Sequence, residues 1–212
     1  PSALWTAFRT VNRVKNIGDK PWTKDGGLPC VWTLGMFSPG ENCLAILPFR
    51  ADNPDPDKGP AVRSDYFGVL DETRFRILDG FALFRTDAEF VSKVGILRNR
   101  AKNVMAAYDP DTRVLTIVNF SAIEDEAPYV NERWVTDVDP FYGDVVNSYN
   151  HGGPEAFFEL ESSSPALELD PGESFSHTST TMHFRFETDL ELTAAVKKAL
   201  GLDWEDVQKA WF

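Results

Sequence analysis

Two glutamates stand on alternate positions of the apolar segment FFELES at residues 157–162. In an extended strand successive side chains point to opposite faces, so Glu159 and Glu161 share one face while Phe158 and Leu160 share the other. Two carboxyl groups about 7 Å apart on one face would raise one another's proton affinity if they were shielded from water. Such a group can move protons on and off oxygen. The alternative is a solvated sheet face, on which paired glutamates are ordinary.

A second polar face is expected in the segment SHTSTTMHFRFE at residues 176–187. The alternation places His177, His183 and Arg185 on one face and mostly apolar side chains on the other. If this strand lies beside FFELES, the two polar faces combine into one patch of glutamate, histidine and arginine. Such a patch suits sugar chemistry, because carboxylates and arginine form charge-assisted hydrogen bonds with hydroxyls. The pattern leaves the register open, and a solvated sheet face is again the alternative.

Further polar and aromatic residues are candidates for the same site. Asp87 and Lys93 lie at either side of a strand start and are a candidate ion pair, or ordinary exposed charges. Trp32, inside an apolar segment, is expected in the core, with sugar stacking as the alternative. The segment YGDVVNSYNHGGPE is expected to be a loop in which Asn147 and Tyr149 line a site or fill a packed turn. Other aromatic candidates for sugar stacking are Tyr66, Trp134 and Tyr142.

The composition favours a folded chain with a sizeable core. The 212 residues are 42% hydrophobic and 13% aromatic. A formal net charge of −12 argues against a nucleic-acid partner, because phosphate binding relies on Lys and Arg. No apolar run approaches the length of a membrane span, so no membrane partner is expected. Cys30 and Cys43 allow one bridge or two unpaired thiols, and the absence of CxxC, HExxH and calcium-loop motifs predicts no metal site.

Short alternating segments separated by turn residues predict an all-β fold. The expected strands cover 5–14, 29–37, 43–49, 66–70, 74–85, 90–97, 103–109, 114–120, 157–162 and 174–187. Residues 50–62, rich in proline and aspartate, are expected to form a long polar loop and are a candidate flap. No internal repeat at a fixed period is present, so we expect one domain or part of one.

The tail at residues 189–212 is expected to be helical and to close one end of a sandwich. Asp189 is the expected cap of a helix that ends at Gly201, and Asp203 the expected cap of a second short helix. The apolar stripe expected on the first helix consists of Leu190, Ala194, Val196 and Leu200.

Several strings follow one another in an order that resembles a known family. They are VWTLGMFSPG, LAILPF, DYFGVL, SKVGI, YGDVVNSYN, FFELESSSPALELDPGES and HTSTTMHF. From about residue 10 to its end, the chain resembles a group of uncharacterised bacterial proteins related to galactose mutarotase (aldose 1-epimerase). The resemblance implies the mutarotase-like supersandwich, an antiparallel β fold with a sugar cleft on a concave sheet. Members of that group are longer, so residues 1–212 are expected to be one such domain or its C-terminal part, completed by a second chain or a preceding segment.

The resemblance also implies a proton-transfer residue. Mutarotases use a glutamate base that takes the anomeric hydroxyl proton and a histidine acid that protonates the ring oxygen. The string LESS matches the strand motif that carries the glutamate, with Ser163 where those enzymes have glutamine, so Glu161 is the expected base. In the segment that matches the histidine motif, Trp32 or a neighbour stands where histidine is expected.

The resemblance to mutarotases assigns roles to other positions less specifically. Asp87, in DAEFV, matches a sugar-binding aspartate of the mutarotases. Lys93, His183 or Arg185 are candidates to replace the acid histidine, although no motif selects among them.

The leading hypothesis is therefore a mutarotase-like, carbohydrate-binding protein that epimerises or otherwise processes a sugar without a cofactor. The candidate catalytic residues are Glu161 and His183. The candidate sugar-binding residues are Glu159, Arg185, Asp87, Lys93, Trp32, Tyr149 and Asn147. One alternative is a binding protein that has lost the acid, and another is an accessory domain of a glycosidase or polysaccharide lyase system. A periplasmic or extracellular setting fits sugar scavenging and is the expected location.

Overall fold

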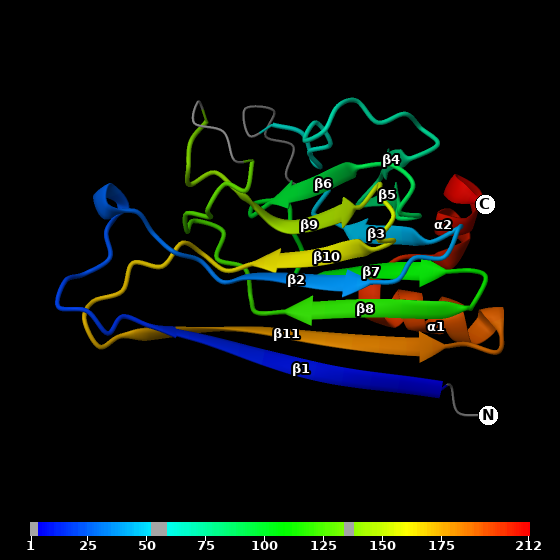
Figure 1. The fold of residues 1–212 in the computed structure, drawn as a ribbon. Coiled ribbons are helices and arrows are strands. Elements are labelled where there is room, and N and C mark those ends of the chain that lie inside the picture. The colour runs from blue at the N-terminus through cyan, green and yellow to red at the C-terminus, as the bar shows by residue number, and fades with distance from the viewer. Residues whose placement is uncertain (1–3, 52–58, 134–137) are drawn as a thin grey trace.

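A computed structural model describes residues 4–51, 59–133 and 138–212 and shows two antiparallel sheets stacked face to face (Figure 1). Over these residues, one sheet has seven strands in the order β1-β11-β8-β7-β3-β5-β4. The other has four strands in the order β2-β10-β9-β6. The predicted all-β sandwich with a helical tail is confirmed.

The element bounds agree with most of the predicted segments. The seven-stranded sheet contains β1 (Leu4–Lys15), β3 (Leu44–Pro48), β4 (Phe75–Leu78), β5 (Phe81–Arg85), β7 (Val104–Asp109), β8 (Val114–Phe120) and β11 (Ser174–Arg185). The four-stranded sheet contains β2 (Trp32–Phe37), β6 (Ser92–Leu97), β9 (Asp144–Asn150) and β10 (Phe158–Ser163). A 3₁₀ turn, η1 (Lys24–Gly26), precedes β2, and the helices are α1 (Asp189–Leu200) and α2 (Trp204–Trp211).

Three of the predicted segments are wrong. The single strand expected over 74–85 is instead the hairpin of β4 and β5, with a turn at Gly80, whose φ is 81°. Residues 66–70 form no strand, and Val69 there is 96% exposed. Gly68, with φ of 119°, adopts a backbone conformation that strands do not use. Conversely, the loop expected around Asn147 is strand β9, which pairs with β10 on one side and β6 on the other. Two paired neighbours satisfy the backbone hydrogen bonds of β9, and this outweighs the turn preference of its asparagines.

Two separate apolar cores hold the layers together. The first lies between the sheets and includes Leu47, Phe84 and Met105 from the larger sheet and Ile96 and Leu160 from the smaller one. The second lies between the outer face of the larger sheet and the two helices. Its buried members include Ile46, Leu83, Leu115, Val196 and Trp204. The helices therefore cover the outer face of the seven-stranded sheet, and they do not cover the outer face of the four-stranded sheet.

The start of α1 differs from the prediction. Thr188, rather than Asp189, caps the helix, and its hydroxyl accepts a hydrogen bond from the main-chain N–H of Glu191 at 3.3 Å. Asp189 is instead the first helical residue, where a carboxylate interacts favourably with the helix dipole. Gly201 ends the helix with φ of 74°, as predicted.

Of the four residues expected on the buried stripe of α1, Val196 and Leu200 are buried, whereas Leu190 and Ala194 are exposed. Leu192 is buried as well, and Leu190 is 80% exposed. The second helix begins after Asp203, as predicted, but the Asp203 carboxylate accepts a hydrogen bond from the Lys197 ammonium at 2.8 Å instead of capping α2.

Three remaining expectations concern the thiols, the polar loop and membrane spans. Cys30 and Cys43 are unpaired, and burial raises the pKa of both thiols to about 11. Trp134 and much of the polar loop at 50–62 lie outside the described residues. None of the described helices has the length and apolar character needed to cross a membrane.

Candidate functional site

The outer face of the four-stranded sheet carries chemically active side chains in register. Glu159 on β10 lies directly opposite Tyr149 on β9, and Tyr149 lies opposite Lys93 on β6. In the adjacent row, Glu161 lies opposite Asn147. Residues directly opposite each other in paired strands share a face, so antiparallel pairing gathers these side chains from three strands.

A register shift brings a further carboxyl group to this face. The pairing of β6 with β9 shifts between Ile96 and Leu97, so that Asp144 pairs with Leu97. A bulge of this kind changes the face on which the following side chains point. Gly95 makes room for the side chains of Asp144 and Asn147, because a Cβ atom at position 95 would lie 2.4 Å from the Asp144 Oδ2 atom and 2.7 Å from the Asn147 Oδ1 atom.

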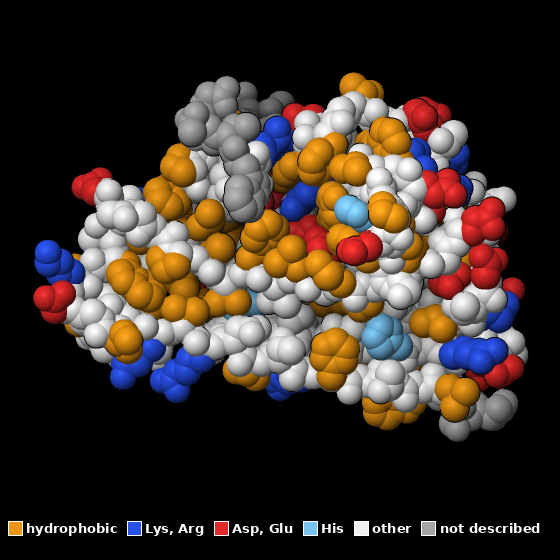
Figure 2. Space-filling model, in the orientation of Figure 1, with side chains coloured by type: hydrophobic (Ala, Val, Ile, Leu, Met, Phe, Trp, Pro, Cys, Tyr) orange, Lys and Arg blue, Asp and Glu red, His pale blue; other side chains and the backbone are white. Residues whose placement is uncertain are grey.

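A hollow of about 370 Å³ opens over this face and is termed the glutamate pocket. It is lined by Trp32, Leu34, Tyr66, Phe67, Lys93, Glu132, Arg133, Tyr149, Glu159 and Glu161. Figure 2 shows basic and acidic side chains inside a hollow of this surface, with hydrophobic side chains around them. Its volume falls within the range of pockets that hold small molecules.

Glu161 is held in place at the centre of the pocket. The side chain is 0% exposed, and its Oε2 atom accepts hydrogen bonds from Lys93 Nζ at 2.9 Å and from Trp32 Nε1 at 2.8 Å. The Lys93 ammonium also lies 5.0 Å from the Trp32 ring centre and 5.4 Å from that of Tyr66. The Oε1 atom of Glu161 is buried and has no hydrogen-bond partner among the described residues. One oxygen is therefore held by two donors of the protein, and the other has no partner among the described residues.

Glu159 lies beside Glu161 in a different environment. Burial, reinforced by the charge of Glu161, raises the pKa of Glu159 to about 7, although Lys93 opposes the shift. Glu159 therefore holds a proton more readily than an ordinary glutamate, while Glu161 accepts hydrogen bonds from Lys93 and Trp32. The pair therefore combines a carboxyl group that can give a proton with one that can accept it.

A buried polar network supports the pocket from behind. Glu132 accepts a hydrogen bond from the main-chain N–H of Asp144 at 3.3 Å and from the Ser163 hydroxyl at 3.2 Å. Burial and the neighbouring Asp144 raise the pKa of Glu132 to about 8. The Tyr66 hydroxyl donates to Asp144, and Arg63 Nη1 lies 3.8 Å from the Asp144 Oδ1 atom. Burial also raises the pKa of Asp144.

The structure brings together most of the residues expected to bind a sugar. Glu159, Glu161, Lys93, Trp32 and Tyr149 all line the glutamate pocket. The expectation that Trp32 lies in the core is wrong, because its half-buried indole N–H points to Glu161. Asn147 is fully buried, directly opposite Glu161. Of the other aromatic candidates, Tyr66 lines the pocket and Tyr142 does not.

FFELES and the histidine-bearing strand were considered as neighbours that share one polar patch, and this is wrong. β11 lies between β1 and β8 in the seven-stranded sheet, whereas β10 belongs to the other sheet. His183 lines a separate hollow of about 430 Å³, where its Nδ1 atom lies 2.9 Å from the Thr116 hydroxyl. Arg185 is exposed near the end of β11. A polar contact between β11 and β10 involves other residues, because His177 Nε2 lies 2.9 Å from the Ser162 hydroxyl.

Asp87 and Lys93 are not partners, contrary to the candidate pairing. The Asp87 carboxylate pairs with Arg74 at 2.6 Å and accepts a hydrogen bond from Asn150 Nδ2 at 3.2 Å. Lys93 pairs with Glu161 instead. Asp87 lies in the connection between β5 and β6, whereas Lys93 lies within β6 and points to the pocket face.

Glu132, Arg133 and Phe67 line the pocket without having been predicted. Glu132 and Arg133 lie outside the regular strands, in a segment with no alternation that would assign a side chain to a face. The available signal for these two was the acidic and aromatic character of residues 121–144, which does not single out a residue. Phe67 lies in residues 66–70, which were expected to form a strand and do not.

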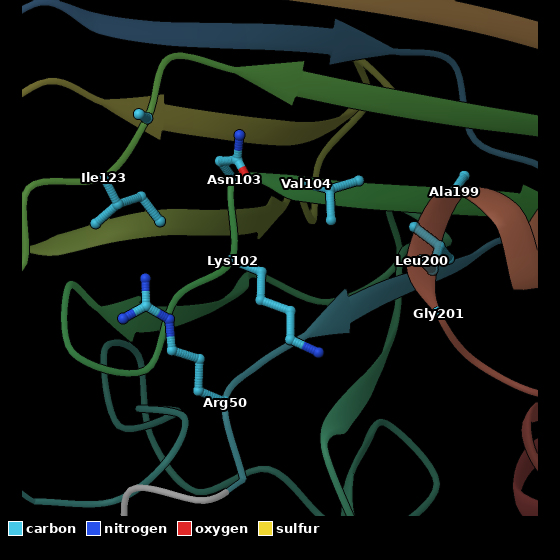
Figure 3. A pocket seen from close by; sticks show the side chains of 9 residues that line it. Arg50, Lys102, Asn103, Val104, Ile123, Ala199, Leu200 and Gly201 are labelled. Carbon is cyan, nitrogen blue, oxygen red and sulfur yellow. The ribbon is translucent and has the colours of Figure 1, made fainter.

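A larger hollow lies elsewhere and lacks acid–base chemistry. It has a volume of about 530 Å³ and lies between the start of β7 and the end of α1 (Figure 3). Its polar side chains are Arg50, Lys102 and Asn103, and the remaining lining residues are Val104, Ala122, Ile123, Ala199, Leu200 and Gly201. Arg50 pairs with Asp125 at 2.6 Å on the surface. Without a carboxyl or imidazole group in its lining, this hollow offers no counterpart to the glutamate pair.

The described part of the chain contains no convergent group of three or more His, Cys, Asp or Glu side chains that would hold a metal ion. The polar groups in the described lining of the glutamate pocket are carboxyl, ammonium, guanidinium, phenol and indole groups.

The fold and the site together define an antiparallel β-sandwich protein with a carboxylate-lined pocket. More specifically, the chain belongs to DUF6786, a family of unknown function whose model matches residues 2–211. No match was found among curated proteins.

Two solved structures are similar in fold. The Slr1438 protein from Synechocystis sp. PCC 6803 is 13% identical with a TM-score of 0.53, and the match covers 85% of this chain and 51% of that one. A protein from Escherichia coli K12, described as a proposed aldose 1-epimerase, is 11% identical with a TM-score of 0.43, and the match covers 85% and 57%. The chain thus spans little more than half the length of these structures. The likeness to Slr1438 concerns the fold alone.

Proposed function

We propose that the glutamate pocket binds a sugar and transfers protons at its anomeric centre, as in an aldose 1-epimerase. Glu161 is the proton acceptor. Its role is to take the proton of the anomeric hydroxyl, so that the carbon–oxygen bond to the ring oxygen can break and an open-chain aldehyde can form. Closure of the ring on the other face of the aldehyde then gives the other anomer.

The observation that carries this proposal is the unequal use of the two Glu161 oxygens. Lys93 and Trp32 both donate to Oε2, which orients the carboxylate, while Oε1 is buried with no partner among the described residues. An unpaired buried acceptor is costly, so such an atom points to a ligand that would satisfy it. A sugar hydroxyl supplies the missing donor.

The walls of the pocket support a sugar as that ligand. The rings of Trp32, Tyr66, Phe67 and Tyr149 surround the carboxyl pair and offer flat apolar surfaces. Both cations in the described lining already have carboxylate partners, because Lys93 pairs with Glu161 and Arg133 with Asp65. No unpaired positive charge is left for an acidic sugar, so a neutral aldose is the favoured substrate class.

Polarimetry on a panel of neutral aldoses tests the proposal. The wild-type chain should accelerate mutarotation, and Glu161→Gln should lower the rate roughly 10²- to 10⁴-fold. Glu168→Gln makes the same chemical change at an exposed position after β10 and should leave the rate unchanged. If the wild-type chain accelerates mutarotation of no sugar above buffer, the epimerase proposal is wrong.

A non-catalytic sugar-binding protein is the second candidate. The observation in its favour is that no histidine is found in the described lining of the glutamate pocket. Saturable binding of a sugar, measured by calorimetry and retained in Glu161→Gln without any acceleration of mutarotation by the wild type, would favour this candidate over the enzyme.

A further inference from the structure

Glu159 and Glu161 project from the same strand face but have unequal partners. Glu161 is contacted by an ammonium and an indole N–H, both within 2.9 Å of its Oε2 atom. An ammonium in contact stabilises the ionised form of a carboxyl group. Among the described residues, the Glu159 carboxyl group receives no comparable donor, although it lines the same pocket. Glu161 is thus the member of the pair that holds the cation, and Glu159 is the member on which burial and the neighbouring charge favour a proton.

Every group that faces Glu159 is compatible with this assignment. Glu161 on the same strand is negative, and Tyr149 on β9 is a phenol whose pKa is raised by burial, so it stays neutral. Met36, directly opposite on β2, carries no charge. Lys93 on β6 is the one cation that acts on Glu159, and it is already paired with Glu161.

The reaction requires an acid and a base that reach two oxygens of one carbon. The anomeric hydroxyl oxygen and the ring oxygen are both bonded to the anomeric carbon, so they are close neighbours. The two carboxyl groups project from alternate positions of one strand and both line the same hollow. A sugar placed over the pair can therefore present one oxygen to each carboxyl group.

We propose that Glu159 is the catalytic acid that protonates the ring oxygen, so that one strand supplies both members of the acid–base pair. This inference rests on the proposed epimerase function. In ring opening, Glu161 takes the hydroxyl proton, the bond between the anomeric carbon and the ring oxygen breaks, and Glu159 gives its proton to the ring oxygen. In ring closure both transfers reverse. The pair returns to its starting state, and no other reagent is consumed.

Other proton-bearing groups in the pocket are committed elsewhere. The Tyr66 hydroxyl donates to Asp144, and the Tyr149 hydroxyl lies 3.1 Å from His151 Nδ1. Lys93 is bound to Glu161, and His183 lies in a different hollow. Glu132 bears a raised pKa, but its carboxyl group faces Ser163 and the backbone of Asp144. Glu159 is thus the acid that is placed beside Glu161 and remains without another role.

Kinetics of Glu159→Gln on the full chain test the inference, with the aldose that the wild type isomerises fastest. The variant should lose roughly 10²- to 10⁴-fold in kcat, with a KM within about threefold of the wild type, because glutamine keeps the shape and loses the proton. Glu168→Gln is the matched control and should behave as the wild type. Circular dichroism and thermal unfolding establish that each variant is folded, and Glu159→Asp, which keeps a carboxyl group, should recover part of the lost rate.

The pH profile separates an acid from a merely structural residue. The wild-type rate should fall as the pH rises through about 7, where Glu159 loses its proton, and this limb should be absent from the residual rate of Glu159→Gln. Carbon NMR of the free protein should show a carboxyl resonance that titrates near pH 7 and is missing in the variant.

A wild type that accelerates mutarotation of no aldose overturns the proposed function and this inference together. An active wild type matched in rate and pH profile by Glu159→Gln overturns the role of Glu159 alone.

Discussion

Strands β10 and β11 both alternate polar with apolar side chains, and in both strands polar side chains are buried. On β10 the apolar residues enter the core between the sheets, and Glu159 and Glu161 face outward into the glutamate pocket. On β11 the arrangement is reversed. His177 faces the other sheet, while Met182 and Phe184 pack against the second core below the helices. Alternation thus defines the two faces of a strand, but the layer that covers each face determines its environment.

The two buried polar regions also differ in charge. The pocket of β10 holds an ion pair and carboxyl groups, whereas the inward face of β11 holds neutral hydroxyls and an imidazole. Burial disfavours the charged form in both regions, so it raises the pKa of Glu132 and Glu159 and lowers that of His177. The same physical cause therefore predicts opposite dependences of stability on pH for the two regions.

The largest effect is expected from breaking the ion pair of the pocket. Lys93→Met should lower the free energy of unfolding by ~3–5 kcal/mol, because it leaves Glu161 buried without its cation. Lys197→Met is the matched control. It removes an exposed pair with Asp203 and should cost ~0–1 kcal/mol. Urea unfolding of both variants measures the difference, and equal losses would show that the pocket pair is no more important than a surface pair.

A pH-dependent gain is expected from Glu132→Gln. The folded pKa of about 8 exceeds the ordinary 4.5, so the native state binds more protons than the unfolded state between these values. The wild type therefore loses stability as the pH rises through this window. Glutamine removes the loss and should make the variant more stable at pH 9, relative to pH 4, by on the order of 3 kcal/mol. Thermal unfolding over this range tests the sign, and a constant difference between variant and wild type contradicts it.

Ser162→Ala tests the neutral region. It removes the described partner of His177 Nε2 across the sheets and should cost ~1–3 kcal/mol, because the imidazole stays buried without that hydrogen bond. Ser176→Ala, at an exposed position on β11, should cost little. Chemical denaturation gives both values, and the prediction fails if the two serines are equivalent.

The smallest effect concerns the pH dependence contributed by His177. Because burial lowers its pKa, the unfolded state binds the proton more readily, and stability is lost as the pH falls below about 6.5. His177→Gln should reduce this loss on acidification, opposite in sign to the effect of Glu132→Gln. Thermal unfolding between pH 8 and 5 gives the slope, with His183 present in both proteins. An unchanged slope would show that His177 does not titrate differently in the folded state.

Most strands were predictable because their residues alternate or form apolar runs bounded by turn residues. β9 was not, since its asparagines and the nearby glycines favour a loop, and only its two neighbours in the sheet make it a strand. The error at residues 66–70 has the opposite origin. Its apolar residues resemble a strand, but no neighbouring strand pairs with them. Pairing is non-local, and a short segment does not reveal its partner.

The candidate site was predictable only in part. Glu161 and Glu159 were identifiable because they share a face of one strand, and Lys93 and Tyr149 were named as separate candidates. Their meeting depends on the register of β6 and β9 against β10. His183, Arg185 and Asp87 were grouped with them by residue type, but each lies elsewhere in the structure.

By itself, the sequence determined the all-β class, the helical tail and the opposite faces of β10, because local periodicity and turn chemistry encode them. Only the tertiary structure decided which sheet each strand joins, that Trp32 and Lys93 hold one oxygen of Glu161, and that Glu159 stays without a cation of its own. These outcomes depend on contacts between residues far apart in the chain. Two similar glutamates on one strand face therefore have different partners, and burial with the neighbouring charge raises the pKa of Glu159.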